Sequence, residues 1–253
     1  MTARADRRSG QFARPLLLDL YCCQGGAAAG YAAAGFDVIG VDLAPQPRYP
    51  YRFVQADALG YLRMLIDTGA IAAFAAVHAS PPCQRKTRAQ KIQQRDHPAL
   101  IAPTRALLAA TGLPYVIENV VPDGSDDDPL IGPVTLCGAM FPGLHTYRHR
   151  EFESNMPLTV PAHPPHRAPT VKMGRPVHDG DWYHAVGNFS NVGYVRRDLG
   201  TPWMNRDGLR ECIPPAYAEY IGQQLITTLR HGTPPAVAAR QAQPALFGWE
   251  TAA

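Results

Sequence analysis

Short apolar runs alternate with helical patterns over the first half of the chain. The apolar runs predict buried strands over residues 15–21, 37–43, 53–58, 72–79 and 114–120. Small-residue or amphipathic stretches between them predict helices over residues 27–36, 58–69 and 98–112. Strands of this kind, separated by helices, are typical of a parallel sheet covered on both faces. We therefore expect an α/β fold that binds its ligands at the carboxyl ends of the strands.

The pattern loosens after residue 122. Two further strands are predicted over residues 134–141 and 147–153, and residues 157–199 are rich in Pro, His, Gly and Arg. A helical pattern over residues 206–229, with two prolines near its start, is expected to pack back on the sheet. A Pro/Ala/Gln-rich end is expected to be flexible. We divide the chain into a core, a small irregular lobe, a returning C-terminal segment and a tail, over residues 14–152, 153–205, 206–230 and 231–253.

The composition is that of an ordinary globular protein of 253 residues. No apolar stretch approaches the roughly 20 residues of a membrane span, and the basic N-terminus lacks the apolar region of a secretory signal. The five cysteines are odd in number and widely scattered, which favours reduced thiols in the cytoplasm over a disulfide framework. No two of them form a CxxC pair, and His163 and His166 have no matching cysteines, so we expect no metal.

Positive charge is clustered rather than high overall. The formal net charge is only +3, but residues 85–95 alone hold five cationic side chains. Further arginines crowd the second half of the chain: Arg148, Arg150, Arg167, Arg175, Arg196, Arg197, Arg206 and Arg210. Each of them alone is well explained as part of a solvated surface. Together they favour a nucleic-acid partner.

The first predicted strand leads into a glycine-bearing turn, DLYCCQGG, and then into a helix. Glycine lets a backbone approach a ligand closely, and a helix N-terminus favours polar or anionic groups. Asp42, about 20 residues further on, is placed to bind ribose hydroxyls, and Asp57 to accept from the amine of an adenine. The alternative is that each aspartate only caps the following helix. We expect a nucleoside-bearing cofactor, held by Asp19, Tyr21, Cys22, Cys23, Gln24, Gly25, Gly26, Asp42, Asp57 and Pro81.

Cys83 lies in the loop SPPCQ, which follows a predicted strand and precedes the cationic residues. A lone cysteine is usually a small buried apolar residue, but a cysteine flanked by cations favours thiolate and suits a nucleophile. Glu118 ends the next predicted strand, where an acidic side chain is hard to bury without a partner. That partner is either a ligand or an arginine.

These segments together carry a family resemblance. DLYCCQGG, AGFDVIGVDL, SPPCQ, IENV and YRHRE occur in this order, and residues 16–152 resemble the DNA (cytosine-5) methyltransferases. GLRECIPPAYAEYIG is similar to the closing motif of that family. The resemblance implies a Rossmann-like methyltransferase core that binds S-adenosylmethionine. It also implies that residues 153–205 form the target-recognition lobe.

The resemblance also implies a mechanism. The thiolate of Cys83 would add to carbon 6 of cytosine, so that carbon 5 can accept the methyl group, while Glu118 binds the N3/N4 edge. Arg148 and Arg150 match the paired arginines of the family, which hold the base and support the adduct. The base must first flip out of the duplex, at a cost of a few kcal/mol. DNA contacts are expected from Gln84, Arg85, Lys86, Arg88 and Lys91.

Three departures from the family pattern matter. Cys23 stands where the family usually has glycine, and Tyr147 stands where the arginine motif usually begins with glutamine. The recognition lobe is short, and each bidentate base contact adds only about 1–3 kcal/mol of discrimination. We therefore expect a short or degenerate recognition sequence. The aromatic residues of the lobe belong either to its DNA face or, as we expect, to its core: Trp182, Tyr183, Tyr194 and Trp203.

We expect an enzyme that acts as a monomer on double-stranded DNA in the cytoplasm of a bacterium or a phage-infected host. The same chemistry on tRNA or single strands is an alternative, and so is a catalytically idle relative that only binds nucleic acid. A metabolic methyltransferase would not explain cations beside a thiol. The sequence leaves open whether the protein accompanies a restriction enzyme, acts alone or protects phage DNA.

Overall fold

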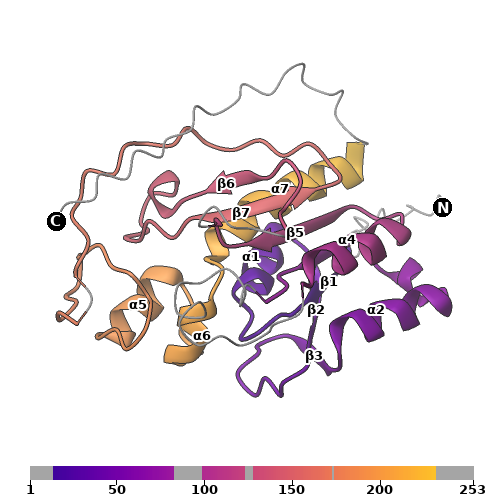
Figure 1. Ribbon diagram of the computed structural model, residues 1–253, viewed down its shortest axis with the longest axis horizontal. Helices are drawn as coiled ribbons and strands as arrows, with labels where there is room; N and C mark the ends of the chain where they lie inside the picture. The colour runs from indigo at the N-terminus through magenta and orange to yellow at the C-terminus, as the bar shows by residue number, and fades with distance from the viewer. Residues whose placement is uncertain (1–13, 83–98, 123–127, 173, 232–253) are drawn as a thin grey trace, which may run out of the picture.

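The computed structural model describes residues 14–82, 99–122, 128–172 and 174–231. Its centre is a seven-stranded sheet with the order β3-β2-β1-β4-β5-β7-β6 (Figure 1). The strands are β1 (Leu16–Leu20), β2 (Asp37–Asp42), β3 (Arg52–Gln55), β4 (Ala76–Ala79), β5 (Tyr115–Asn119), β6 (Val134–Leu136) and β7 (Arg150–Ser154). β1 to β5 are parallel, and β7 is antiparallel to both β5 and β6. This confirms the α/β fold expected from the sequence.

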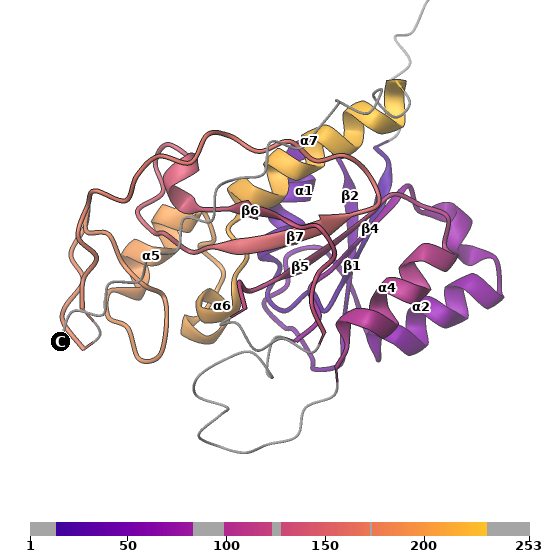
Figure 2. The same ribbon diagram turned by 45° about the horizontal axis from the view of Figure 1, so that its top comes forward.

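Helices cover both faces of the sheet (Figure 2). On one face lie α1 (Gly26–Ala34) and α7 (Pro215–His231), and on the other lie α2 (Ala58–Asp67) and α4 (Ile101–Ala110). The central strands β1, β4 and β5 are buried on both sides, which is why they read as apolar runs. α7 packs against α1 and the sheet, as expected for the returning segment.

The contact between α1 and α7 depends on small residues. A Cβ atom on Gly30 of α1 would collide with the carbonyl oxygen of Pro215, so the two helices approach backbone to backbone. The sequence GAAAGYAAA of α1 has little apolar bulk, and its large side chain, Tyr31, is fully buried. The close approach of the two helix backbones therefore fills the space that larger side chains would otherwise occupy between α1 and α7.

The topology creates a crevice at the carboxyl end of the sheet. The chain runs from β1 outward through β2 to β3, and then crosses back so that β4 pairs with the other side of β1. Connections on the two sides of β1 therefore diverge, and a doubly wound sheet binds its ligands at such a point. Asp19 of β1 lies there, in register with His78 of β4.

The second half of the chain forms a lobe around α5 (Val192–Leu199) and α6 (Arg206–Glu211), on the left in Figure 1. Tyr183 and Tyr194 lie in its apolar core, and Trp203 packs against it. Trp182 packs on the main core and stacks on Tyr147. The aromatic residues therefore serve packing, as we expected.

Four elements differ from the sequence expectation. Of the strand expected over residues 134–141, only β6 (Val134–Leu136) forms, because Gly138–Met140 is a 3-10 turn (η3). Only residues 76–79 of the run 72–79 form a strand, because Ala70–Ala73 is a 3-10 turn (η1). The helix expected over residues 206–229 is two helices, because Pro214 and Pro215 cannot continue α6. α5 lies where no element was predicted; Asn191 caps its first turn and Gly200 its last.

No helix of the described chain has both the length and the apolar character to span a membrane. The described cysteines are free thiols: Cys22, Cys23, Cys137 and Cys212. Cys83 lies outside the described residues.

Candidate active site

A cavity of about 530 Å³ opens at the carboxyl ends of β1, β2, β4 and β5. Its volume is typical of a site for a small organic ligand. It gathers most of the residues that the sequence predicted: Asp19, Tyr21, Cys22, Cys23, Gln24, Gly26, Asp42, Asp57, Pro81, Glu118 and Arg150. Gly25 and Arg148 are outside its wall. One cavity thus joins the predicted cofactor residues to two of the predicted catalytic residues.

The turn after β1 has an unusual backbone. Tyr21 (φ 59°) and Cys23 (φ 45°) are two of the three non-glycine residues with positive φ in the described chain. Gly25 (φ 83°) then precedes α1. Left-handed backbone is costly for residues with a side chain, and it concentrates at functional sites. Glycine adopts such a conformation more readily than cysteine, so the positive φ at Cys23 carries a cost in this chain.

Contacts from elsewhere in the chain hold this turn. The backbone N–H of Cys23 donates to Oδ2 of Asp42 at 2.9 Å, and its thiol donates to Glu211 at 3.0 Å. The side chain of Gln24 exchanges two hydrogen bonds with Asn205, at 2.8 and 3.1 Å. The indole of Trp203 donates to the Gln24 carbonyl oxygen at 2.7 Å. The start of α6 therefore braces the turn, a role that the sequence analysis missed.

The three predicted cofactor aspartates have different environments. Burial, with a smaller contribution from the charge of Asp42, raises the pKa of Asp19 to about 8. The buried carboxyl group of Asp19 lies beside the buried hydroxyl of Tyr49, and this interaction offsets part of the rise in its pKa. Asp42 instead accepts the backbone N–H groups of Cys23 and Ala44. Asp57 caps α2 by accepting from Gly60 at 2.7 Å and also lines the cavity, so the cap does not exclude a contact with a cofactor.

Glu118 and Arg150 form an ion pair in the wall of the cavity. Nε of Arg150 lies 2.8 Å from Oε1 of Glu118, and both side chains are largely buried. The two residues meet because β5 and β7 are neighbouring antiparallel strands. Glu118 therefore has an arginine partner, and because both residues line the cavity, the pair does not exclude a ligand there.

Arg148 points away from the cavity. Its guanidinium is buried and donates to the carbonyl oxygens of Leu209 and Arg210 in α6. Burial, together with the charge of Arg150, lowers the pKa of Arg148 to about 10. Its backbone carbonyl accepts from the hydroxyl of Tyr217 at 2.7 Å. Arg148 thus connects the residues just before β7 to α6 through its side chain and to α7 through its backbone.

Buried polar side chains fix the turn that precedes Cys83. His78 is fully buried, contacts the Tyr31 hydroxyl at 2.9 Å and the Ser80 hydroxyl at 2.7 Å, and burial lowers its pKa to about 3. Asn119 donates to the Pro81 carbonyl oxygen at 3.1 Å. The sequence analysis missed these roles, although each residue is a polar interruption of an apolar run. The described chain reaches the cavity wall at Pro82.

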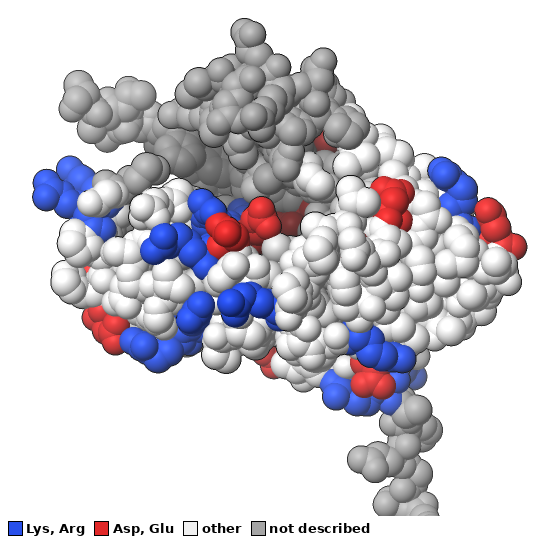
Figure 3. Space-filling model, turned by 90° about the horizontal axis from the view of Figure 1, so that it is seen from below, with Lys and Arg blue, Asp and Glu red and all other residues white. Residues whose placement is uncertain are grey.

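The predicted nucleophile and the predicted DNA-contact loop lie outside the described residues: Cys83, Gln84, Arg85, Lys86, Arg88 and Lys91. In the described chain, Arg210 contributes to the cavity wall, and Arg48 bonds the carbonyl oxygen of Trp203 at 3.2 Å. Figure 3 shows the molecule from below, with Lys and Arg side chains at the left and at the lower right and acidic side chains among them.

No protein-family model matches the sequence, and no curated protein matches it. Among solved structures, the chain is similar to a protein described as a DNA modification methyltransferase encoded within an E. coli prophage. The TM-score is 0.58 and the identity 15%, over 85% of this chain and 99% of that chain. It is also similar to the Entamoeba histolytica methyltransferase EhMeth, with a TM-score of 0.54 and 11% identity over 85% and 99% of the two chains. The chain therefore has the Rossmann-like methyltransferase fold.

Proposed function

We propose that this chain transfers a methyl group from S-adenosylmethionine to carbon 5 of a flipped cytosine in double-stranded DNA, with Cys83 as the nucleophile. One observation supports this most directly. The Glu118–Arg150 ion pair and the turn that leads into Cys83 share a cavity with the turn after β1. A methyl donor and a base to be methylated need such a shared space.

The cavity suits a cationic cofactor. Five acidic side chains line it, against only two arginines, Arg150 and Arg210; the acidic residues are Asp19, Asp42, Asp57, Glu118 and Glu211. S-adenosylmethionine carries a sulfonium and an ammonium group, which an acidic wall attracts. The pKa of Asp19 is raised to about 8, so at neutral pH Asp19 is protonated and the other four acidic side chains supply the negative charge. Asp42 keeps lone pairs free beyond its two backbone hydrogen bonds, so it can also accept from ribose hydroxyls. When bound, the cofactor supplies an electrophilic methyl group.

Glu118 and Arg150 suit the pyrimidine side of the reaction. A carboxyl group at this position can accept from the N4 amine of cytosine and share a proton with N3, which makes carbon 6 electrophilic. Arg150 fixes that carboxyl group through its Nε, while its Nη1 donates to the His149 carbonyl oxygen at 3.0 Å. The arginine charge also stabilises negative charge that develops on the ring.

The chain supplies the nucleophile from the turn that Asn119 and His78 hold. Cys83 follows Pro82 by one Cα–Cα step of about 3.8 Å. Its thiolate forms a bond to carbon 6 as the ring takes a proton at N3, and carbon 5 becomes nucleophilic. After methylation, carbon 5 loses its proton to a base and the bond from sulfur to carbon 6 breaks. The thiolate and an aromatic methylcytosine are restored.

A mechanism-based trap tests the proposal. In duplex DNA containing 5-fluorocytosine, fluorine replaces the proton that must leave, so the covalent complex persists. We expect wild-type protein with S-adenosylmethionine to form a complex stable to denaturation, and Cys83→Ala to form none. Met64→Ala, on the exposed face of α2, is the control and should react like wild type.

Two other outcomes of the trapping experiment would contradict the proposal. A complex formed on tRNA but not on duplex DNA would reassign the substrate, and binding without any covalent complex would indicate an idle relative. The short lobe predicts that bisulfite sequencing of DNA from expressing cells shows a short or degenerate methylated context. A strict site of about six base pairs or more would contradict that expectation.

A further inference from the structure

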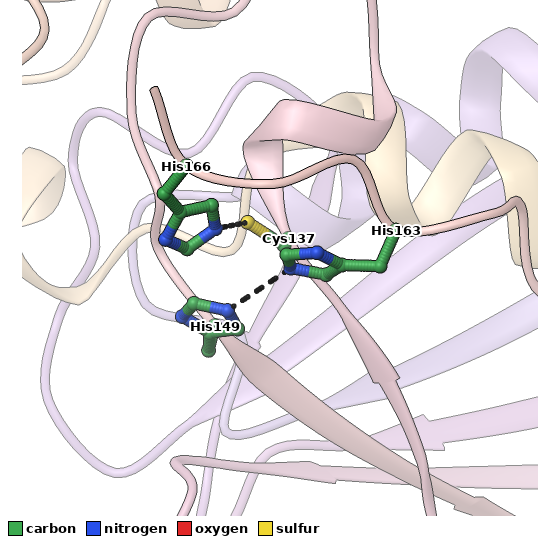
Figure 4. Close-up of side chains that lie close together, drawn as sticks. All are labelled: Cys137, His149, His163 and His166. Carbon is green, nitrogen blue, oxygen red and sulfur yellow. Dashed lines mark hydrogen bonds between the residues drawn. The ribbon is translucent and has the colours of Figure 1, made fainter. Parts of the chain in front are cut away.

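Four potential metal ligands converge outside the cavity (Figure 4). Cys137 directly follows β6, and His149 directly precedes β7. His163 and His166 come from the segment beyond β7, which has no regular secondary structure. One ligand atom from each residue lies within 4.8 Å of those of the other three. Three separate parts of the chain therefore bring a thiol and three imidazoles to one point.

The spacing of these atoms suits a tetrahedral ion. Sγ of Cys137 lies 3.3 Å from Nε2 of His166, and Nε2 of His149 lies 3.3 Å from Nε2 of His163. In a tetrahedral zinc site, bonds of about 2.0–2.1 Å to nitrogen and about 2.3 Å to sulfur place the ligand atoms roughly 3.3–3.7 Å apart. Hydrogen bonds explain each pair separately. They do not explain why both pairs share one small volume.

Neighbouring groups orient the ligands. The ring of Tyr147 stacks on His166, with centroids 3.7 Å apart and planes at 15°, and Trp182 stacks on Tyr147. The Tyr147 hydroxyl donates to the carbonyl oxygen of Ala168 and accepts its N–H, both at 3.0 Å. Cys137 Sγ lies 3.6 Å from the Tyr147 carbonyl oxygen. Contacts of this kind fix the ligands of metal sites in place.

The segment that carries His163 and His166 needs such a support. None of residues 154–170 is buried, and the apolar contacts of this stretch with the main core, from Met156, Leu158 and Val160, end before His163. Small regions that lack a core are commonly stabilised by an ion instead. His166 is exposed, which gives an ion a path from solvent.

We propose that Cys137, His149, His163 and His166 bind one Zn²⁺ ion as a structural site. Thiolate and imidazole ligands suit zinc, and four protein ligands close the coordination shell, as in structural rather than catalytic sites. The ion itself displaces the thiol proton of Cys137. The site fastens the segment around His163 to the β6–β7 hairpin, and it lies one residue from Arg150.

Spacing rules could not find this site. The ligands follow Cys-x11-His-x13-His-x2-His, with no short-spaced cysteine pair. The His163–His166 pair was the only local signal, and the sequence analysis set it aside because no cysteine was near. Cys137 and His149 meet it only through the hairpin and the loop that folds over it.

Cobalt substitution tests the site without reference to activity. Full-length wild-type protein is stripped with a chelator and titrated with Co²⁺. We expect about one ion per chain, the visible absorption of tetrahedral Co²⁺ and a thiolate-to-cobalt charge-transfer band. Zinc should displace the cobalt. A wild-type protein that gives no tetrahedral spectrum would overturn the proposal.

Variants identify the ligands. Cys137→Ser should lose the charge-transfer band, and His166→Ala, which removes an exposed ligand at little cost in packing, should weaken Co²⁺ binding about tenfold or more. His178→Ala, at an exposed histidine outside the cluster, is the matched control and should bind like wild type. If Cys137→Ser kept the band, cobalt would be bound by another cysteine and the assignment would be wrong.

Discussion

The cavity and the Cys137–histidine cluster both gather polar side chains from distant parts of the chain, but in different ways. The cavity is about 530 Å³, acidic, and built from the ends of strands that follow one another in a parallel sheet. The cluster confines four ligand atoms within 4.8 Å and joins a hairpin to a segment without regular structure. The first suits an organic cation and a base, and the second suits a single ion. The cavity could therefore be predicted from the sequence, because its residues follow the strands of a regular sheet. The cluster could not, because its ligands come from a hairpin and an irregular segment.

The largest expected effect comes from Glu118→Gln in the cavity. The amide keeps the shape but cannot share a proton with N3, so we expect methyl transfer to fall about 10²–10⁴-fold. Zinc content should stay unchanged, because the cluster does not contact Glu118. Radiolabelled methyl incorporation measures the first effect and metal analysis the second. Glu219→Gln on α7 is the control, and a loss below about tenfold would contradict the role of Glu118.

Removal of the metal connects the two regions and should have a smaller effect. Arg150 directly follows the proposed ligand His149, and a displacement of about 1 Å at a reacting group can cost about 10²-fold in rate. We expect chelation to lower methyl transfer about 10–100-fold and added zinc to restore it. Calorimetry should show little change in S-adenosylmethionine affinity. Equal losses of rate and affinity would show that the metal supports the whole cavity instead.

The buried carboxyl group of Asp19 predicts a dependence of stability on pH. Folding raises its pKa from the ordinary 3.8 to about 8, chiefly through burial. The folded chain therefore keeps a proton that the unfolded chain has lost, and the free energy of unfolding falls as pH rises from about 4 to about 8. In urea unfolding without ligand, Asp19→Asn should show a smaller fall. Asp67→Asn, at the exposed end of α2, is the control, and its free energy of unfolding should fall with pH as in wild type. Equal falls in wild type, Asp19→Asn and Asp67→Asn would refute the role of Asp19.

The smallest effect is expected at the turn after β1. Cys23→Gly relieves the left-handed backbone but loses the contact with Glu211, so we expect stability to rise by about 1 kcal/mol at most. Cys22→Gly, at a buried neighbour without positive φ, should lower stability. Urea unfolding compares the two. A large loss in Cys23→Gly would mean that the thiol–carboxylate contact outweighs the backbone strain.

Much of the fold followed from local patterns. The central strands β1, β4 and β5 are largely apolar and buried, because a strand covered on both faces has no side that faces water, whereas the edge strand β3 has exposed ends. The position of β7 between β5 and β6, antiparallel to both, could not be predicted, since it depends on pairing rather than on composition. The same pairing brings Arg150 to Glu118. The sequence could say that Glu118 needed a partner but could not choose among the arginines.

From the sequence alone we could predict the alternation of strands and helices up to β5, the edge of the sheet where Asp19, Asp42 and Glu118 lie, and the turn that carries Cys23. These features are local or follow from parallel topology, in which every strand ends at the same edge. The tertiary structure alone decided that Arg150 and not Arg148 faces the cavity, that Gln24 is held by Asn205, and that Cys137 meets three histidines. Those contacts join residues far apart in the chain through loops and an antiparallel strand, and no periodicity records where such segments come together.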